Sequence, residues 1–295
     1  MEYLEVFKEL KKRSGTHSPS IEELKERLGL KVRIDACFLS NPYATELFIK
    51  YLQRDVIDKG LLREILEYYP QQNADIATIL GKQLNMPSEN LFIGNGAIEV
   101  IQAVLHNVVK GKIAIPIPTF SSYYEFLSSE ESAVYFQLRE KDNFQLDLNE
   151  YHEFIKTNDL KNALLINPNN PDGSYLQRND LIDFLEKCRD LDCIIIDESF
   201  GHFAYENLDL DRTTLEQVAL EYPNLIVIKS MSKDFGIAGI RAGYGVMNGV
   251  YVSKLLSNGY LWNLNGLATY FFKVYCNESF QREYETVRKK YIMNT

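Results

Sequence analysis

Two lysines and an arginine follow an apolar run in the segment IVIKSMSKDFGIAGIRAGYG, residues 226–245. Lys229, Lys233 and Arg241 surround a glycine turn, directly behind residues that predict a buried strand. Lysine is usually solvated, so a chance surface cluster would also explain this segment when it is taken alone. In open parallel sheets, however, ligands bind beyond the carboxyl ends of the strands. Cations at such a place would suit a phosphate, and a lysine there could act as a nucleophile.

Polar residues also follow two other apolar runs. Asp197 comes after CIII, in surroundings too apolar to solvate a carboxylate without a cation or hydrogen bonds. A helix cap or a structural ion pair would explain Asp197 equally well. The run ALLI is followed by NPNNPDG, residues 167–173, in which two prolines would fix one amide side chain at the end of a strand. Ordinary turn chemistry also accounts for that loop.

Two more motifs lie where strands end. IGNGAIE, residues 93–99, is a glycine turn that leads into a helix, and a helix N-terminus suits a phosphate. Taken alone, this motif predicts a tight connection just as well. TFSSYYEF supplies Tyr123 and Tyr124, either of which could cover a flat ring, although a core aromatic is the commoner explanation. One ligand with a phosphate, a flat ring, a ring nitrogen and an aldehyde would account for all five strand ends. Pyridoxal 5'-phosphate has these groups.

The elements that must position these residues alternate along the chain. Nearly continuous apolar runs predict parallel strands buried on both faces, namely KIAIPIP, NALLINP, CIIIDES and NLIVIKS. Amphipathic segments between them predict crossover helices at 97–109, 178–190 and 213–222. An earlier helix is predicted after Ser20, because Glu23 can complete a capping box. The order is that of an α/β fold.

Composition restricts the class of protein further. The 295 residues are 45% hydrophobic and 25% charged, which predicts a globular protein with one large core or two modest domains. A net charge of -9 argues against nucleic-acid or anionic-membrane partners, since both favour a basic surface. No signal peptide or membrane-spanning run is predicted, so a cytoplasmic location and a small-molecule partner are expected. The cysteines lack metal-ligand spacing and predict free, mostly buried thiols rather than a metal site: Cys37, Cys188, Cys193 and Cys276.

In this order, GNGAIE, PTFSSYYEF, NPNNPDG, IIIDES and SMSKDFGIAGIRAGYG resemble motifs of the fold-type I pyridoxal-phosphate enzymes. The resemblance is strongest to the histidinol-phosphate aminotransferase group of class I/II aminotransferases, and it extends from residue 40 to about Asn263. It implies a three-layer αβα large domain around a mostly parallel sheet. Residues 1–36 would form an N-terminal helical arm and part of a small domain, and 37–260 the cofactor-binding domain. Residues 261–295 would begin the connection to a small C-terminal domain that is truncated.

The resemblance also assigns roles by motif position. Lys233 would form the Schiff base with the cofactor and carry protons, whereas Lys229 matches no motif position. Asp197 would pair with the pyridinium nitrogen, Asn170 would bind the ring hydroxyl oxygen, and Tyr123 would stack on the ring. The cofactor phosphate would be bound by Gly96, Ala97, Ile98, Ser230, Ser232 and Arg241. Tyr43 would reach the phosphate bound by a partner subunit, which implies a homodimer.

Three departures from the family pattern affect the predicted reaction. Phe200 replaces a tyrosine, Asp172 replaces a threonine, and neither Arg282 nor Arg288 matches the arginine that binds the substrate carboxylate. The resemblance implies an aminotransferase that moves an amino group between an amino acid, or a phosphorylated amino compound, and a 2-oxo acid. Phe200 is also expected of relatives that resemble the threonine-phosphate decarboxylase. The alternatives are therefore a decarboxylase of threonine or serine phosphate type, or an inactive, truncated homologue that only binds the cofactor.

Overall fold

The computed structural model of the chain describes residues 2–13, 19–34, 38–204 and 213–294, in two compact units. Residues 1–39 form the first unit, which contains helices α1 (Glu2–Arg13) and α2 (Ile21–Leu28). The N–H of Glu23 donates to Ser20 Oγ at 3.1 Å, and the N–H of Ser20 donates to Glu23 Oε2 at 3.0 Å. This reciprocal pair is the predicted capping box, so the start of α2 is confirmed. The division of the chain at residues 36 and 260 stays a prediction.

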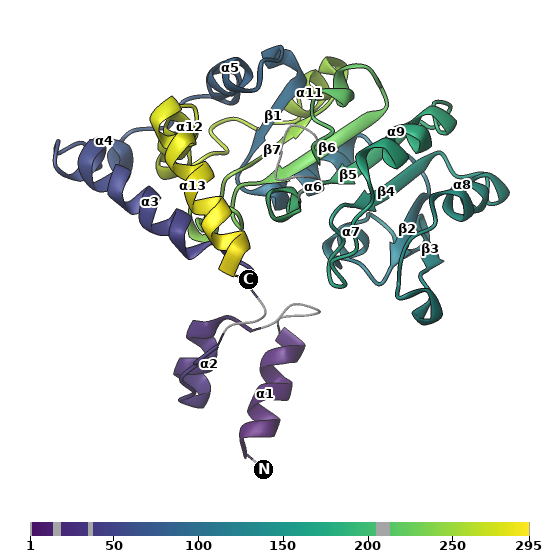
Figure 1. Cartoon of the computed structure of the whole chain (residues 1–295), viewed down its shortest axis with the longest axis horizontal. Helices are drawn as coiled ribbons and strands as arrows, with labels where there is room; N and C mark the ends of the chain where they lie inside the picture. The colour runs from purple at the N-terminus through teal and green to yellow at the C-terminus, as the bar shows by residue number, and fades with distance from the viewer. Residues whose placement is uncertain (1, 14–18, 35–37, 205–212, 295) are drawn as a thin grey trace. The chain divides into compact units, whose positions relative to one another are not determined.

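The second unit, residues 40–295, is built on a seven-stranded sheet with the order β1-β7-β6-β5-β4-β2-β3 (Figure 1). Its strands are β1 (Leu91–Gly94), β2 (Ile113–Ile117), β3 (Ala133–Gln137), β4 (Asn162–Ile166), β5 (Cys193–Asp197), β6 (Leu225–Ser230) and β7 (Gly243–Val246). The four apolar runs form β2, β4, β5 and β6, as predicted. β7 pairs antiparallel with both β1 and β6, and the other pairs in the sheet are parallel. The fold is the expected α/β class with a mostly parallel sheet.

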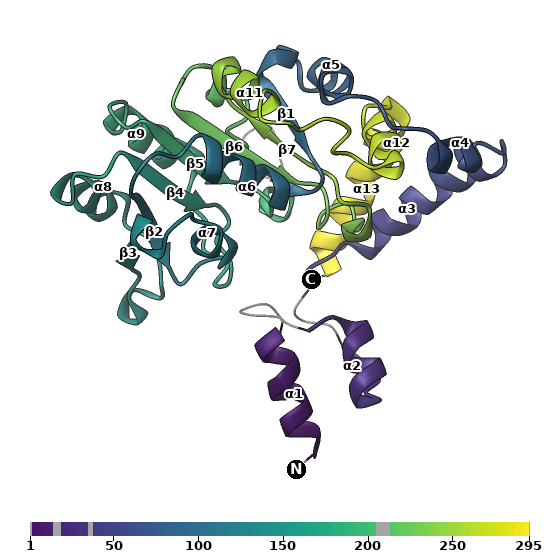
Figure 2. The same cartoon turned by 180° about the vertical axis from the view of Figure 1, so that it is seen from behind.

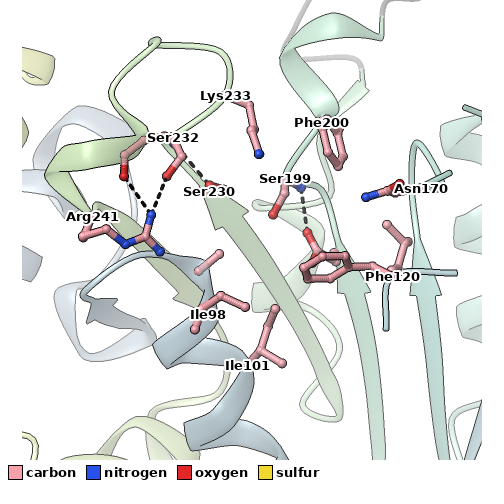
Figure 3. Close-up of a pocket in the computed structure, with 14 residues that line it drawn as sticks. Ile98, Ile101, Phe120, Asn170, Ser199, Phe200, Ser230, Ser232, Lys233 and Arg241 are labelled. Carbon is pink, nitrogen blue, oxygen red and sulfur yellow. Dashed lines mark hydrogen bonds between the residues drawn. The ribbon is translucent and has the colours of Figure 1, made fainter. Parts of the chain in front are cut away.

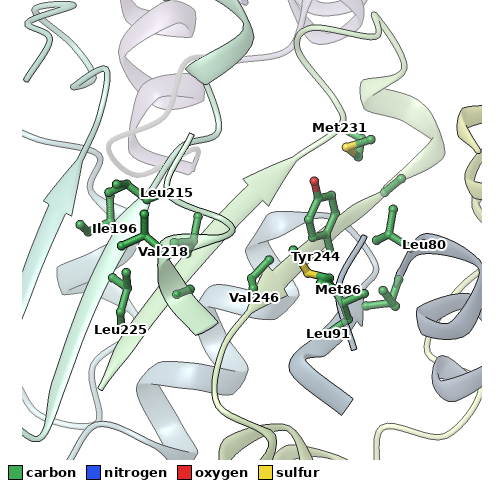
Figure 4. Close-up of a cluster of buried hydrophobic side chains, with 14 of the residues drawn as sticks. Leu80, Met86, Leu91, Ile196, Leu215, Val218, Leu225, Met231, Tyr244 and Val246 are labelled. Carbon is green, nitrogen blue, oxygen red and sulfur yellow. The ribbon is translucent and has the colours of Figure 1, made fainter. Parts of the chain in front are cut away.

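Helices cover both faces of this sheet, which gives three layers (Figures 1 and 2). On one face lie α6 (Ala97–Asn107) and α11 (Gly249–Leu256). On the other face lie α5 (Asn73–Leu84), α8 (Leu148–Thr157), α9 (Arg178–Lys187) and α12 (Gly266–Tyr275). Successive side chains of β5 alternate between the two cores, because Ile194 and Ile196 pack on the second face and Ile195 on the first. Figure 4 shows part of the second core, around Tyr244 and Val246.

The predicted helix at 213–222 is wrong. In residues 214–222 the only helical element is a 3₁₀ turn, at Val218–Leu220. Two residues before this turn bind a buried carboxylate: Thr214 Oγ1 donates to Glu198 Oε2 at 2.7 Å, and the Leu215 N–H donates to Oε1 at 2.8 Å. Satisfying the buried charge of Glu198 therefore outweighs the helical preference of the segment.

Two helices from opposite ends of the second unit lie side by side (Figures 1 and 2). They are α3 (Pro42–Leu52) and α13 (Glu278–Asn294). Glu283 joins them, because its carboxylate accepts hydrogen bonds from Lys50 Nζ at 2.6 Å and from the Tyr51 hydroxyl at 3.0 Å. The α4 (Leu62–Glu67) and α7 (Ser122–Glu125) helices are shorter. Among the helices of the described residues, none combines the length and the apolar character that crossing a bilayer needs.

The cysteines that the structure describes agree with their prediction as free thiols. Cys188 and Cys193 are buried, and Cys276 is partly buried. Burial raises the pKa of the Cys188 and Cys193 thiols to about 12, so both are protonated at neutral pH. Cys37 lies outside the described residues.

Candidate active site

A cavity lies at the carboxyl ends of β4, β5 and β6, beside the first turn of α6 (Figure 3). The connections that follow these strands, together with α6, supply most of its wall. Its lining residues are Ala97, Ile98, Ile101, Phe120, Ile166, Asn170, Asp197, Ser199, Phe200, Ser230, Ser232, Lys233, Ala238 and Arg241. The strand-end motifs of the sequence therefore converge on one place, as expected for ligand sites in parallel sheets.

Asp197 lines this cavity from the end of β5 and is 3% exposed. Its Oδ1 accepts a hydrogen bond from the N–H of Ser199 at 2.8 Å, and its Oδ2 accepts one from the Tyr123 hydroxyl at 2.7 Å. Burial raises the pKa of Asp197, while these two hydrogen bonds and the charge of Lys229 oppose the rise. A cation bound beside Asp197 would stabilise its ionised form further.

Lys233 extends into the cavity from the turn after β6, toward Ser199 (Figure 3). The backbone of this turn is held by the start of α3. Asn41 donates its N–H to the carbonyl oxygen of Lys233 at 3.0 Å, and Thr45 Oγ1 donates to that of Gly236 at 2.8 Å. Gly236 has a φ of 62°, and a Cβ there would lie 2.1 Å from Thr45 Oγ1, so this position requires glycine. The turn is thereby fixed against α3.

Arg241 and the N-terminus of α6 form the cationic end of the cavity. Gly96 precedes the helix with a φ of 83°, and a Cβ at this residue would lie 2.4 Å from Arg241 Nη2. The absent side chain lets the guanidinium pack against the first turn of α6. Arg241 Nη1 also lies 3.4 Å from Ser232 Oγ, and the N–H of Ser232 donates to Ser230 Oγ at 3.2 Å. Unpaired helix N–H groups, hydroxyls and a guanidinium together suit a phosphate.

The NPNNPDG loop directs Asn170 toward the cavity (Figure 3). Its other asparagines hold the loop itself. Asn167 exchanges hydrogen bonds with the backbone of Leu176, at 2.8 and 3.0 Å. Asn169 donates to Asp172 Oδ1 at 2.6 Å and accepts from Thr119 Oγ1 at 2.9 Å. Only the amide of Asn170, among the asparagines of this loop, therefore lines the cavity.

Most of the predicted site residues come together in this cavity, with Gly96 directly at its edge, but Tyr123 does not line it. Tyr123 is completely buried and its hydroxyl is bound to Asp197, so it has no face left for a ring. The aromatic side chain that lines the cavity from this segment is Phe120 (Figure 3). The structure therefore does not support stacking by Tyr123, and the aromatic side chain that a flat ring in this cavity could contact is that of Phe120. The signal that could have identified Phe120 is its position, as the first aromatic residue after the end of β2.

The other candidates lie elsewhere. The hydroxyl of Tyr43 lies 3.2 Å from Asn294 Nδ2, and the Lys290 ammonium lies over the Tyr43 ring. Lys229 is buried outside the cavity and pairs with Glu198 at 3.1 Å. Arg288 is also buried and pairs with Glu285, so it does not reach the cavity either. Ser199 and Phe200 do line it.

Comparison with known proteins defines the class to which this fold and cavity belong. The model of the aminotransferase class I and II family matches residues 41–294. The chain therefore belongs to this family of pyridoxal-phosphate enzymes, and its cofactor is pyridoxal 5'-phosphate.

Individual relatives show which members of the family this chain is similar to. An L-serine phosphate decarboxylase of Campylobacter jejuni is 50% identical over 290 residues, which are 98% of this chain and 74% of that protein. The solved structure of a decarboxylase from Sulfurospirillum multivorans superposes with a TM-score of 0.91 at 43% identity, covering 99% of this chain and 75% of that one. A histidinol-phosphate aminotransferase of Thermoanaerobacter pseudethanolicus is 32% identical over 203 residues, or 68% of this chain and 55% of that protein. The sequence identity to the decarboxylases is thus higher, and it extends over more of this chain.

The donor groups in the cavity suit pyridoxal phosphate. Arg241, the two serines and the α6 N-terminus can bind a phosphate, and Asp197 is a buried carboxylate that a ring nitrogen can satisfy. Lys233 supplies the amine that an aldehyde requires. Gly96 leaves the space beside the helix terminus that a side chain would fill.

Proposed function

We propose that this chain is a decarboxylase of a phosphorylated amino acid, with O-phospho-L-serine as the first candidate substrate. The observation that carries this proposal is the 50% identity over nearly the whole chain to an L-serine phosphate decarboxylase. The aminotransferase expected from the sequence motifs has weaker support, because its relatives are about a third identical over a shorter part of the chain. Loss of carbon dioxide from phosphoserine would leave ethanolamine phosphate, and no 2-oxo acid acceptor is consumed.

Held by the residues of the cavity, pyridoxal phosphate would supply a ring that accepts electrons from the substrate Cα when a bond to that carbon breaks. Asp197 would maintain this withdrawal by holding a negative charge at the ring nitrogen. Tyr123, from behind, would keep that carboxylate ionised and oriented through its 2.7 Å hydrogen bond. Phe120 would cover one ring face, and Asn170 would bind the ring hydroxyl oxygen.

Lys233 would hold the cofactor before the substrate arrives and then move a proton at the substrate Cα. Decarboxylation breaks the bond between Cα and the carboxylate carbon, and the electron pair left on Cα must take up one proton to form the amine product. Lys233 reaches into the cavity from a turn whose backbone is fixed by α3, so its amine is well placed to deliver that proton. Arg241, Ser230, Ser232 and the residues 96–98 would anchor the cofactor phosphate.

We also propose that the active form is a homodimer. An apolar surface of the second unit supports it, since Tyr69 is 82% exposed, Leu66 70% and Trp262 50%. The Tyr69 and Trp262 rings lie 5.3 Å apart, so these side chains form part of one patch. A second copy of the chain would cover it. Tyr43, which lies outside the cavity, would then be a candidate to approach the partner's cofactor.

The direct test supplies the holoenzyme with O-phospho-L-serine, O-phospho-L-threonine or histidinol phosphate, each with and without 2-oxoglutarate. Released carbon dioxide and the phosphorylated amine are measured beside glutamate formed by amino transfer. The proposal expects carbon dioxide and ethanolamine phosphate in equal amounts from phosphoserine, independent of 2-oxoglutarate. Glutamate formation without carbon dioxide would instead establish the aminotransferase.

A further inference from the structure

Beneath the turn that carries Lys233, a second set of titratable side chains is buried outside the cavity. Asp234 follows Lys233 in the chain and is 3% exposed. Its Oδ2 lies 3.1 Å from Nδ1 of His202, which belongs to the 3₁₀ turn Gly201–Phe203. The hydroxyl of Tyr284, from α13, lies 2.7 Å from the same ring nitrogen. The turn after β6, the turn after β5 and α13 thus meet at one imidazole nitrogen.

Aromatic packing holds this meeting point rigidly. The ring of Phe235, the next residue along the turn, stacks on Tyr284 with centroids 4.1 Å apart. The imidazole of His202 packs edge-on against Phe235 at 5.5 Å. The N–H of Phe235 donates to Asp234 Oδ1 at 3.1 Å, so both carboxyl oxygens have partners. The orientation of the Asp234 carboxyl is therefore coupled to the backbone that presents Lys233.

Burial shifts the pKa values of both Asp234 and His202. Burial raises the pKa of Asp234 to about 7, and the charge of Lys229 opposes the rise. Burial also lowers the pKa of His202 well below its ordinary value, in the same direction as the charges of Lys229 and Arg288. The carboxyl is therefore partly protonated at neutral pH while the ring stays neutral, so the proton of this pair lies on the Asp234 side, facing Nδ1 of His202. The other groups that act on this set come from every packed element: Lys229, Glu198, Glu216, Tyr244, Tyr275 and Arg288.

We propose that Asp234 is a positioning residue for Lys233, that it shares a proton with His202, and that its ionisation sets the pH at which the Lys233 nitrogen loses its own proton. An ionised carboxyl on the residue next to Lys233 favours the protonated form of that nitrogen, whereas a neutral carboxyl does not. The inference rests on the proposed bond between Lys233 and the cofactor. It does not depend on which reaction follows.

The test uses the holoenzyme without substrate. The absorption of bound pyridoxal phosphate reports the protonation of the nitrogen that joins it to Lys233, so its pH titration measures that pKa directly. In Asp234→Asn the transition moves to lower pH by about one unit, the smaller end of the shift caused by a nearby charge. Glu216→Gln is the matched control, because Glu216 is a buried carboxyl of the same polar core that binds Tyr244 instead of His202. Its transition stays with that of the wild type.

A pair of substitutions at His202 gives an independent test should Asp234→Asn fail to take up the cofactor. In His202→Leu the carboxyl loses its polar partner, burial keeps it protonated, and the transition moves to lower pH. In His202→Asn the side-chain amide can replace Nδ1–H, and the transition returns toward that of the wild type. Equal titrations for Asp234→Asn and Glu216→Gln, or for the two His202 variants, would overturn the proposal. Failure of the Lys233 assignment itself would appear differently, as cofactor label on another lysine after borohydride reduction.

Discussion

Replacing Tyr123 by phenylalanine removes one hydroxyl from behind the candidate site and leaves the cavity wall intact. That hydroxyl donates to Asp197 Oδ2 at 2.7 Å in a completely buried setting. Burial, followed by the charge of Asp197, raises the pKa of Tyr123 well above its ordinary value, so the hydroxyl keeps its proton and remains a donor. A hydrogen bond to a charged group contributes roughly 1.5–3 kcal/mol. Since one pKa unit corresponds to about 1.4 kcal/mol, its loss should raise the pKa of Asp197 by about one to two units.

The sign of the effect on activity follows from the form of Asp197 that the reaction needs. Only the ionised carboxylate supports a protonated ring nitrogen, so a higher pKa removes the active form at a higher pH. In Tyr123→Phe the acid limb of the kcat/KM profile for phosphoserine decarboxylation should therefore move up by about one to two pH units. Rates at a fixed pH on that limb fall by about 10- to 100-fold.

Tyr151→Phe is the matched control for this prediction. Tyr151 is equally buried, but its hydroxyl donates to the carbonyl oxygens of Ala114 and Leu164, at 2.8 and 3.0 Å, away from the cavity. Both variants lose a buried hydrogen bond and both should lose stability. Only Tyr123→Phe should shift the acid limb. A shift of the same size in both variants, or in neither, would refute the link between Tyr123 and the charge of Asp197.

Three further predictions concern the cavity and the polar core behind it. Borohydride reduction of the holoenzyme should attach the cofactor to Lys233, and label on Lys229 instead would sink that assignment. Asp197→Asn should retain cofactor through the phosphate contacts yet lose nearly all turnover, and normal turnover would contradict the role of Asp197. In the cofactor-free protein, Asp197→Asn should be more stable than the wild type at neutral pH but not at acid pH. The pKa of Asp197 is raised in the folded protein, so its contribution to stability is lost as pH rises through that pKa. Urea unfolding midpoints at both pH values check this. Lys229→Met should cost about 3–5 kcal/mol by leaving the buried charge of Glu198 without its cation, and a Lys229→Met, Glu198→Gln double variant should cost less.

Local patterns in the sequence predict the strands and most of the site, because the residue types of each short segment already determine whether it can form a buried strand. Continuous apolar runs are stable only where both faces are covered, so the runs at β4, β5 and β6 could be assigned to a parallel sheet before any packing was known. Once the sheet is parallel, the residues that follow these strands must share one edge. Asp197, Asn170 and Lys233 could be grouped for that reason, although each has an ordinary structural explanation when considered alone.

Long-range contacts decide the remaining features, and no local pattern contains them. Phe120 and Tyr123 are both aromatic and three residues apart. Phe120 precedes the short α7 helix and lines the cavity, whereas Tyr123 belongs to α7, is buried outside the cavity and binds Asp197. The choice depends on how the chain turns after β2 and on a carboxylate 74 residues away. The network of Asp234, His202 and Tyr284 likewise unites three segments, two of them 82 residues apart, around one nitrogen. Such networks form because buried polar groups must find partners wherever the folded chain offers them, and which partners are offered is a property of the tertiary structure.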